Sequence, residues 1–286
     1  MKIGVNTLLW TAGFDSSNFD LLPRIKQWGF DGVEIARFEF DSFPVAETRR
    51  AVADAGLECT FCSALTGSLS LISEYEGVRE NARQFLIRGI ETAAELGAKV
   101  FVGPFCAPVG QLLGRRRTDD EWKRAVDGLA SLGDTLDRCD VDLALEPLNR
   151  FETYFVNTAA DQARLCAEVN HPRIGALLDS FHANIEEKTI GDAAAALGSR
   201  IKHVHTCEND RGIPGSGHVD WEGLFAALRR ESYDRWLVIE SFGFAIEEIA
   251  AAACIWRDLA ANPEAIAVEG LHFLRRMTER ELPAIA

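Results

Sequence analysis

The chain has 286 residues, of which 47% are apolar and 26% charged, a balance typical of a globular protein that buries a sizeable core. Thirty basic and 44 acidic side chains leave a formal net charge of -14. Such a charge repels a phosphate backbone, so it argues against a nucleic-acid-binding protein and favours a small neutral substrate.

The remaining composition indicates a cytoplasmic protein. The first residues, "MKIGVNTLLWTAG", contain one lysine and a short apolar run that does not fit a signal peptide, and charged residues interrupt every longer apolar stretch. The seven cysteines are odd in number and scattered, and the only CxxC pair, Cys59 and Cys62, lies in a strand-like run. We therefore expect reduced cysteines, no membrane contact and a cytoplasmic location.

Short apolar runs alternate with longer segments of helical period along the whole chain, which is typical of βαβ units. The predicted strands are, in order, 3–10, 32–38, 57–65, 99–105, 142–148, 174–181, 201–207 and 236–242. Helices are expected between them, one opened by a capping box of Thr118 and Glu121, and "PEAIAVEGLHFLRRM" adds a helix at the C-terminus. Without a Gly-rich dinucleotide fingerprint, this pattern predicts an α/β fold: a closed (β/α)8 TIM barrel with an extra C-terminal helix, as a single domain over residues 1–286.

Each of the last four predicted strands ends with a residue that can bind a metal ion. These residues are Glu146 in "ALEPL", Asp179 in "LLDSF", His205 in "HVHTC" and Glu240 in "VIESF". In a barrel the carboxyl ends of the strands converge on one mouth, and an unpaired carboxylate among apolar neighbours is costly to bury. Three oxygens and one nitrogen suit one divalent ion, Mn²⁺, Mg²⁺ or Co²⁺, better than a structural zinc site, which would use Cys and His.

The same segments carry a family resemblance. "ALEPLNRFETYFVNT", "LLDSFHANIEE", "HVHTCENDRG" followed by "PGSGHVDW", and "VIESF" resemble the ketose 3-epimerases, the D-tagatose and D-allulose 3-epimerase group of the xylose isomerase-like barrels. The resemblance implies that Glu146, Asp179, His205 and Glu240 bind one divalent metal ion. It also implies that Glu152, His182 and Arg211 bind the substrate around O1 and O2, and that the enzyme needs no other cofactor.

Epimerisation of a ketose at C3 removes a proton beside the C2 carbonyl and returns one to the opposite face, through a cis-enediolate. This requires two acid/base groups on opposite sides of the carbon, and the resemblance assigns them to Glu146 and Glu240. Asp179 and His205 would then be ligands only. The family also implies a ketose as the small-molecule partner and a homodimer or homotetramer.

Further residues near the predicted mouth have two interpretations each. Trp10, with Phe14 and Phe242, either forms an apolar wall beside the sugar or packs the barrel, and Asn6 stands where several family members carry an aromatic residue. We include Trp10 and Asn6 in the predicted substrate site. His203, two residues before His205, is expected deeper in the barrel as packing or support, and His218 in solvent.

The arginines of "GRRRTDDEW" are interpreted as a charged surface balanced by nearby acids rather than as a phosphate clamp, although a phosphorylated substrate stays open.

Other functions use the same barrel. An aldose–ketose isomerase, or an enzyme of a keto-sugar or keto-inositol derivative, would use the same metal-assisted enolisation. A DNA-repair nuclease like endonuclease IV gathers three zinc ions with histidines from both barrel halves, but this acidic chain has no histidine before His171. A non-catalytic binding barrel would leave the two glutamates without a purpose. We therefore predict a sugar epimerase.

Overall fold

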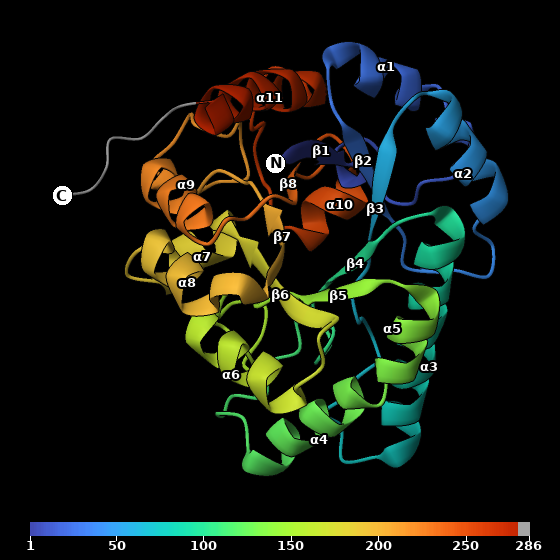
Figure 1. Ribbon diagram of the computed structural model, residues 1–286, viewed down its shortest axis with the longest axis vertical. Coiled ribbons are helices and arrows are strands. Elements are labelled where there is room, and N and C mark those ends of the chain that lie inside the picture. Colours follow the sequence, from blue (N-terminus) through green and yellow to red (C-terminus); the bar gives the residue numbers. More distant parts are fainter. Residues whose placement is uncertain (280–286) are drawn as a thin grey trace.

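Eight parallel strands form a closed barrel in the computed structural model, which describes residues 1–279 (Figure 1). The strands are β1 (Lys2–Asn6), β2 (Gly32–Ala36), β3 (Glu58–Cys62), β4 (Val100–Gly103), β5 (Asp142–Leu145), β6 (Ile174–Asp179), β7 (Ile201–His205) and β8 (Trp236–Ile239). Each strand pairs with the next along the chain, and β8 pairs with β1. The predicted (β/α)8 barrel is confirmed.

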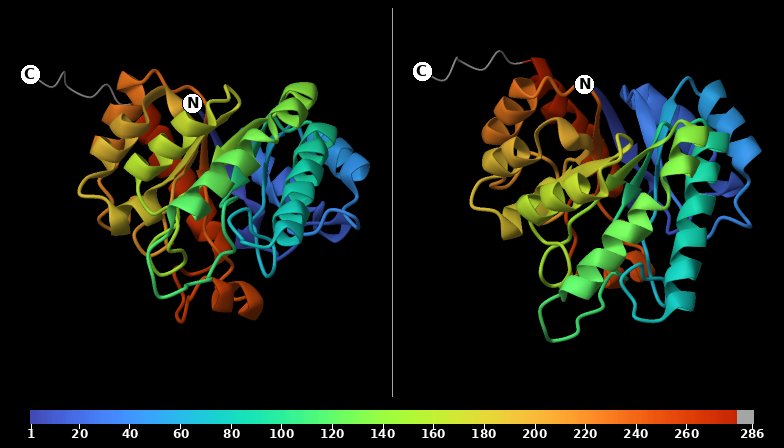
Figure 2. Two further views of the ribbon diagram at one scale, coloured as in Figure 1. Left: turned by 90° about the horizontal axis from the view of Figure 1, so that it is seen from below. Right: turned by 60° about the horizontal axis from the view of Figure 1, so that its bottom comes forward.

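Helices surround the barrel on its outer side, and one short helix lies over its end (Figures 1 and 2). They are α1 (Leu21–Trp28), α2 (Val45–Asp54), α3 (Glu76–Leu96), α4 (Asp119–Ala130), α5 (Gly133–Cys139), α6 (Ala159–Val169), α7 (Ser180–Glu186), α8 (Ile190–Leu197), α9 (Trp221–Arg230), α10 (Glu247–Ala252) and α11 (Pro263–Glu279). Short 3-10 helices span Thr7–Leu9, Ser16–Asn18 and Gly198–Arg200. The predicted C-terminal helix is α11, which packs against α9, β1 and β8 and completes the outer ring. None of the described helices is long and apolar enough to cross a membrane.

The start of α4 has the predicted capping box. The Thr118 hydroxyl accepts a hydrogen bond from Glu121 N–H at 3.2 Å, and Glu121 Oε2 accepts one from Thr118 N–H at 2.7 Å. The arginines before this helix are paired as well, since Arg115 binds Glu121 at 2.8 Å and Arg117 binds Asp161 at 2.7 Å. These two arginines therefore form the internally balanced surface that the sequence indicated.

The strands are buried on both faces, as parallel strands in a barrel must be. The main apolar core lies between barrel and helices and includes Phe101 of β4. A second cluster includes Val100 and Val102, the residues on either side of Phe101, together with Ala144 and Leu177. Because successive side chains of a strand point to opposite faces, this second cluster fills the inside of the barrel.

The carboxyl-terminal end of the barrel is partly covered by α10, which lies over the barrel centre (Figure 1). At the same end, β4 finishes at Gly103, whose φ is 146°. A Cβ atom there would lie 1.9 Å from the Ser63 carbonyl oxygen, so only glycine lets the two backbones approach this closely. The barrel mouth is thus built from tightly packed loops below a short covering helix.

Candidate active site

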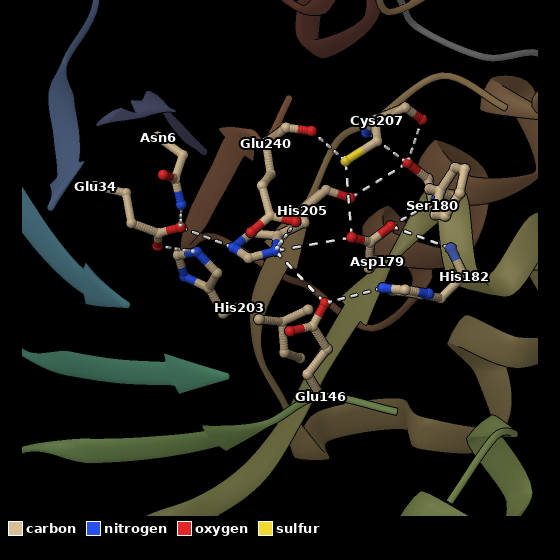
Figure 3. Close-up of polar contacts among 12 residues, drawn as sticks. Asn6, Glu34, Glu146, Asp179, Ser180, His182, His203, His205, Cys207 and Glu240 are labelled. Carbon is tan, nitrogen blue, oxygen red and sulfur yellow. Dashed lines mark hydrogen bonds and ion pairs between the residues drawn. The ribbon is translucent and has the colours of Figure 1, made fainter. Parts of the chain in front are cut away.

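Four side chains from the last four strands or their ends meet at the barrel mouth (Figure 3). Each of Glu146, Asp179, His205 and Glu240, called here the four-residue cluster, offers one ligand atom, and these atoms all lie within 4.8 Å of one another. His205 Nδ1 lies 3.2 Å from Glu240 Oε2, 3.8 Å from Asp179 Oδ2 and 3.9 Å from Glu146 Oε1. The structure thus brings together the four residues that the sequence singled out at the strand ends.

Asp179 has a different partner for each of its carboxylate oxygens. It is the last residue of β6 and the N-cap of α7, where Oδ1 accepts hydrogen bonds from Phe181 N–H at 2.6 Å and His182 N–H at 3.3 Å. Its second oxygen faces the cluster and accepts a hydrogen bond from Arg211 Nη1 at 2.9 Å. The helix start therefore fixes the carboxylate and leaves Oδ2 directed at the cluster.

Arg211 is buried beside the cluster in a left-handed backbone conformation, with φ at 65°. Its Nη1 also donates to Glu240 Oε2 at 2.9 Å, and its guanidinium group lies between two rings, 4.2 Å from Phe181 and 4.8 Å from Phe242. The Ser241 hydroxyl donates to the Arg211 carbonyl oxygen. The loop after β7 thus holds a buried cation against two carboxylates at a backbone conformation that is rare for arginine.

His182 and Glu152 share a partner. Asn149 N–H donates to His182 Nδ1 at 3.1 Å, and the Asn149 side chain donates to Glu152 Oε1 at 2.7 Å. Arg211 Nη2, which can only donate, lies 3.2 Å from His182 Nε2, and Glu146 Oε1 lies 3.5 Å from the same atom. Burial lowers the pKa of His182, so the ring is neutral at neutral pH. Asn149 therefore fixes the side chains of His182 and Glu152, and Nε2 of His182 faces both Arg211 and Glu146.

Glu146 and Asp179 have pKa shifts in opposite directions, although both are buried. Burial and the negative charges of Glu240 and Asp179 raise the pKa of Glu146 well above its usual range, despite His205 and Arg211. For Asp179 the same burial is outweighed by Arg211, His182 and His205, so its pKa is lower than usual. Of these two acids, Glu146 is thus the one that holds a proton more readily when no ion is bound.

A cavity of about 370 Å³ opens above the cluster. Glu146, Glu240, Glu152, His182 and Arg211 line its polar part. The outer part is mainly apolar, and α10 contributes to it; its lining includes Leu8, Ala12, Phe38, Val109, Phe242, Ile249, Ala252 and Ala253. Five residues predicted at the site from sequence thus line one cavity of a size suited to a small molecule.

Two other predicted site residues lie elsewhere. Asn6 is fully buried at the end of β1, donates a hydrogen bond to Glu34 and is not among the residues that line the cavity. Trp10 stacks on Trp28, with ring centroids 5.8 Å apart, because the chain turns away from the mouth through the 3-10 helix Thr7–Leu9. Direct contact of Asn6 and Trp10 with a molecule in this cavity is therefore not supported.

Of the other aromatic residues and histidines considered near the mouth, Phe242 alone is among the residues that line the cavity. Phe242 lines the cavity, whereas Phe14 is fully buried and packs against Phe19. His218 is exposed, as expected of a solvated loop residue. His203 is fully buried, and its Nε2 lies 2.8 Å from Glu34 Oε2, which agrees with its predicted place deeper in the barrel.

Sequence reasoning missed Glu34 of β2. This carboxylate is fully buried and lies 2.8 Å from His205 Nε2. The signal was present, because Glu34 interrupts the apolar run "GVEIARF" just as Glu146 interrupts "ALEPL". Glu34 lies in the middle of its strand, whereas the functional residues of a barrel are expected at the carboxyl ends of the strands.

The four-residue cluster fits a divalent ion. His205 Nδ1 is buried, makes no hydrogen bond of good geometry with any described residue and faces the three carboxylates. Three carboxylates and one imidazole are the donors that Mn²⁺, Mg²⁺ or Co²⁺ accept, and a bound cation would offset the repulsion among the three acids. The chemistry and the orientation of these donors therefore agree with a metal site.

Comparison with known proteins identifies the family. The family model described as xylose isomerase-like TIM barrel matches residues 22–277. The chain is 38% identical over 276 residues to a probable ketose 3-epimerase of a Synechocystis species, covering 96% of each chain. It is 30% identical to a ketose 3-epimerase of Arthrobacter globiformis, also over 96% of each chain.

A solved structure agrees with these relatives. An L-ribulose 3-epimerase superposes with a TM-score of 0.92 at 28% identity, over 97% of this chain and 94% of that one. The fold, the cavity and the sequence comparisons thus lead to one assignment. The chain belongs to the xylose isomerase-like TIM barrel family and, within it, to the ketose 3-epimerases, which are sugar epimerases.

Proposed function

We propose that this protein epimerises an unphosphorylated ketose at C3. The observation that carries the proposal is that Glu146 and Glu240, which follow strands separated by β6 and β7, line one cavity together with Glu152, His182 and Arg211. Arg211 is the only arginine or lysine among the described residues that line this cavity, and it is already paired with two carboxylates. A phosphate group would find no free cation there.

The four-residue cluster holds one divalent ion in this proposal, Mn²⁺ in the first place and Mg²⁺ or Co²⁺ as alternatives. When bound, the ion supplies Lewis-acid stabilisation of negative charge at O2 of the ketose. Asp179 serves as a ligand only, because its other oxygen caps α7. His205 likewise contributes Nδ1 and no proton transfer.

Glu146 and Glu240 transfer the proton. One carboxylate removes the proton from C3, and the electron pair of the C3–H bond becomes the C2–C3 double bond of a cis-enediolate. The other glutamate, protonated at the start, returns a proton to the opposite face of C3 while the C2 carbonyl re-forms. For the reverse substrate the two residues exchange roles, since the pair ends the reaction with the proton on the other member.

Glu152, His182 and Arg211 bind the O1 and O2 end of the ketose. His182 presents its Nε2 edge to this end of the substrate, and Asn149 holds the ring in that orientation. Glu152 accepts from a sugar hydroxyl with the oxygen that Asn149 leaves free. Arg211, held between Phe181 and Phe242, provides a fixed positive charge.

We further propose a homo-oligomer that forms through the rim of the barrel mouth. The most exposed large apolar side chains of the described residues all lie in loops that follow barrel strands: Tyr75, Leu112, Leu113, Phe151 and Trp256. Such a concentration at one end is unusual for a monomer and fits contact with a second copy. Sedimentation equilibrium at micromolar concentration tests this, and a mass of one chain would contradict it.

Isotope exchange in D2O tests the reaction. With Mn²⁺ present and a panel of free ketohexoses and ketopentoses, the proposal expects deuterium at C3 of the ketose and formation of its C3 epimer, both followed by NMR. An aldose–ketose isomerase would place deuterium at C1 or C2 instead. Label that enters only those positions overturns the proposal, and turnover of phosphorylated ketoses alone overturns the substrate class.

A further inference from the structure

Glu34 is the centre of a buried hydrogen-bond network beneath the four-residue cluster (Figure 3). Its Oε1 accepts from Asn6 Nδ2 at 2.9 Å and from His205 Nε2 at 2.8 Å. Its Oε2 accepts from the Thr60 hydroxyl at 2.7 Å and lies 2.8 Å from His203 Nε2. The network joins β1, β2 and β3 to β7 across the inside of the barrel.

The directions of these hydrogen bonds are fixed by their partners. Asn6 Oδ1 accepts from Leu8 N–H at 2.9 Å, so the amide must point its NH2 group at Glu34. A carboxylate without a proton can only accept, so the Nε2 atom of His205 must carry a proton. In the neutral imidazole the lone pair then lies on Nδ1, the atom directed at Glu146, Asp179 and Glu240.

We propose that Glu34 is a positioning residue of the metal site. By accepting from Nε2 it fixes the tautomer and the ring orientation of His205, and it makes Nδ1 a better donor for a divalent ion. The inference rests on the proposed function in one respect, because it assumes that the four-residue cluster binds the ion. Glu34 itself does not touch the ion or the substrate.

The donor atoms of Glu34, His203 and His205 also lie close together, so these residues could instead be interpreted as the site of a second ion. The contacts of Glu34 argue against it. Asn6 and Thr60 both direct hydrogen atoms at this carboxylate, and a cation at the same place would face those positively polarised groups. Glu34 therefore serves as an acceptor of hydrogen bonds rather than as a ligand.

The test compares Glu34→Gln with Thr60→Val. The first substitution keeps the shape of the side chain and removes the charge that faces His205, whereas the second removes one donor to Glu34 and leaves the Glu34–His205 contact in place. Both variants disturb the same buried network, so a loss of thermal stability alone does not distinguish them. Isothermal titration of the metal-free proteins with Mn²⁺ at one pH gives the dissociation constants.

We expect Glu34→Gln to weaken Mn²⁺ binding by about 10- to 100-fold, and Thr60→Val by less than about 3-fold. A second measurement does not need the ion. At a pH high enough for the His205 ring to be neutral, long-range ¹H–¹⁵N correlation of the six histidines should show its Nε2–H tautomer in the wild type and in Thr60→Val, and a mixture in Glu34→Gln.

Equal dissociation constants for the wild type and Glu34→Gln, or an unchanged tautomer of His205, would overturn the inference alone. A wild type that binds no divalent ion would instead overturn the proposed metal site together with this inference. The isotope-exchange experiment described above tests the C3 epimerisation separately from these two results.

Discussion

Glu146 and Glu240 are the two members of the four-residue cluster that line the cavity. Asp179 caps a helix, and His205 donates to Glu34, whereas the carboxylates of Glu146 and Glu240 both line the cavity. Side chains that move a proton need this access, because the proton donor or acceptor must reach the substrate carbon.

Replacing either glutamate by glutamine should therefore abolish turnover and keep the fold. We expect kcat to fall by about 10³-fold or more in Glu146→Gln and in Glu240→Gln, since an amide can neither take nor return the proton. Exposed Glu269→Gln on α11 is the matched control. Kinetics, circular dichroism and Mn²⁺ titration are measured together, and a variant that retains the ion and substantial epimerase activity would falsify the two-base mechanism.

Some residues of the site could be predicted from the sequence and others could not. Glu146, Asp179, His205 and Glu240 were predictable because each ends an apolar run, where a polar residue is costly without a partner. Glu34 is likewise a carboxylate within an apolar run. However, in a strand that is buried on both faces, the sequence does not reveal which face a given residue occupies. Trp10 and Asn6 do not line the cavity, because the chain bends after β1, and such a bend cannot be read from the apolar pattern alone.

At the scale of elements, all eight strands were predictable, but their ends were not. The first was expected over 3–10 and ends at Asn6, and the last was expected over 236–242 and ends at Ile239. The residues beyond these ends, such as Leu8, Leu9 and Ser241, are buried although they no longer pair as strands. Apolar character continues into the loops because the loops themselves form the walls of the mouth.

The capping box of α4 makes a pH-dependent contribution to stability. Hydrogen bonds from Arg115, from Thr118 N–H and from the Tyr154 hydroxyl, which together outweigh the effect of burial, lower the pKa of Glu121 to about 2. A lowered folded-state pKa stabilises the fold above the unfolded value of 4.5, and this contribution is lost as pH falls toward 2.

Glu121→Gln should lower the free energy of unfolding by about 1–2 kcal/mol at pH 7, through weaker capping and the loss of the charged hydrogen bonds. The difference from the wild type should shrink as the pH is lowered from about 5 to about 3. Urea titrations at several pH values measure it, with Asp120→Asn in the same helix turn as the control. A difference that stays constant across this range would show that the charge of Glu121 is not involved.

At the scale of the whole molecule, the repeat of strand and helix was sufficient to predict the barrel. The covering helix α10 was not predicted, because a six-residue helix in a long loop has no clear apolar period. The barrel closes where β8 pairs with β1. Closure brings residues more than 150 positions apart into contact across the barrel, such as Glu34 and His205.

Removal of divalent ions should destabilise the whole barrel as well as inactivate it. Mn²⁺ at about 100 times its dissociation constant adds roughly 2.7 kcal/mol to the free energy of unfolding, equivalent to a rise in Tm of about 5 °C over the EDTA-treated protein. Asp179→Asn is a suitable comparison, because asparagine still caps α7 but is a poorer ligand, and its Tm should hardly respond to Mn²⁺. An equal response of the two proteins in differential scanning calorimetry would place the ion elsewhere.

The contact between Glu34 and His205 also limits how this barrel can be recombined with others. All members of the four-residue cluster follow or end β5 to β8, so the second half of the chain alone carries every donor atom of the cluster. Its histidine, however, depends on an acceptor from β2, which is in turn held by residues of β1 and β3. A chimaera that joins β5–β8 to a foreign first half therefore has to bring an equivalent of Glu34, and a split-protein design has to break the chain without separating this pair.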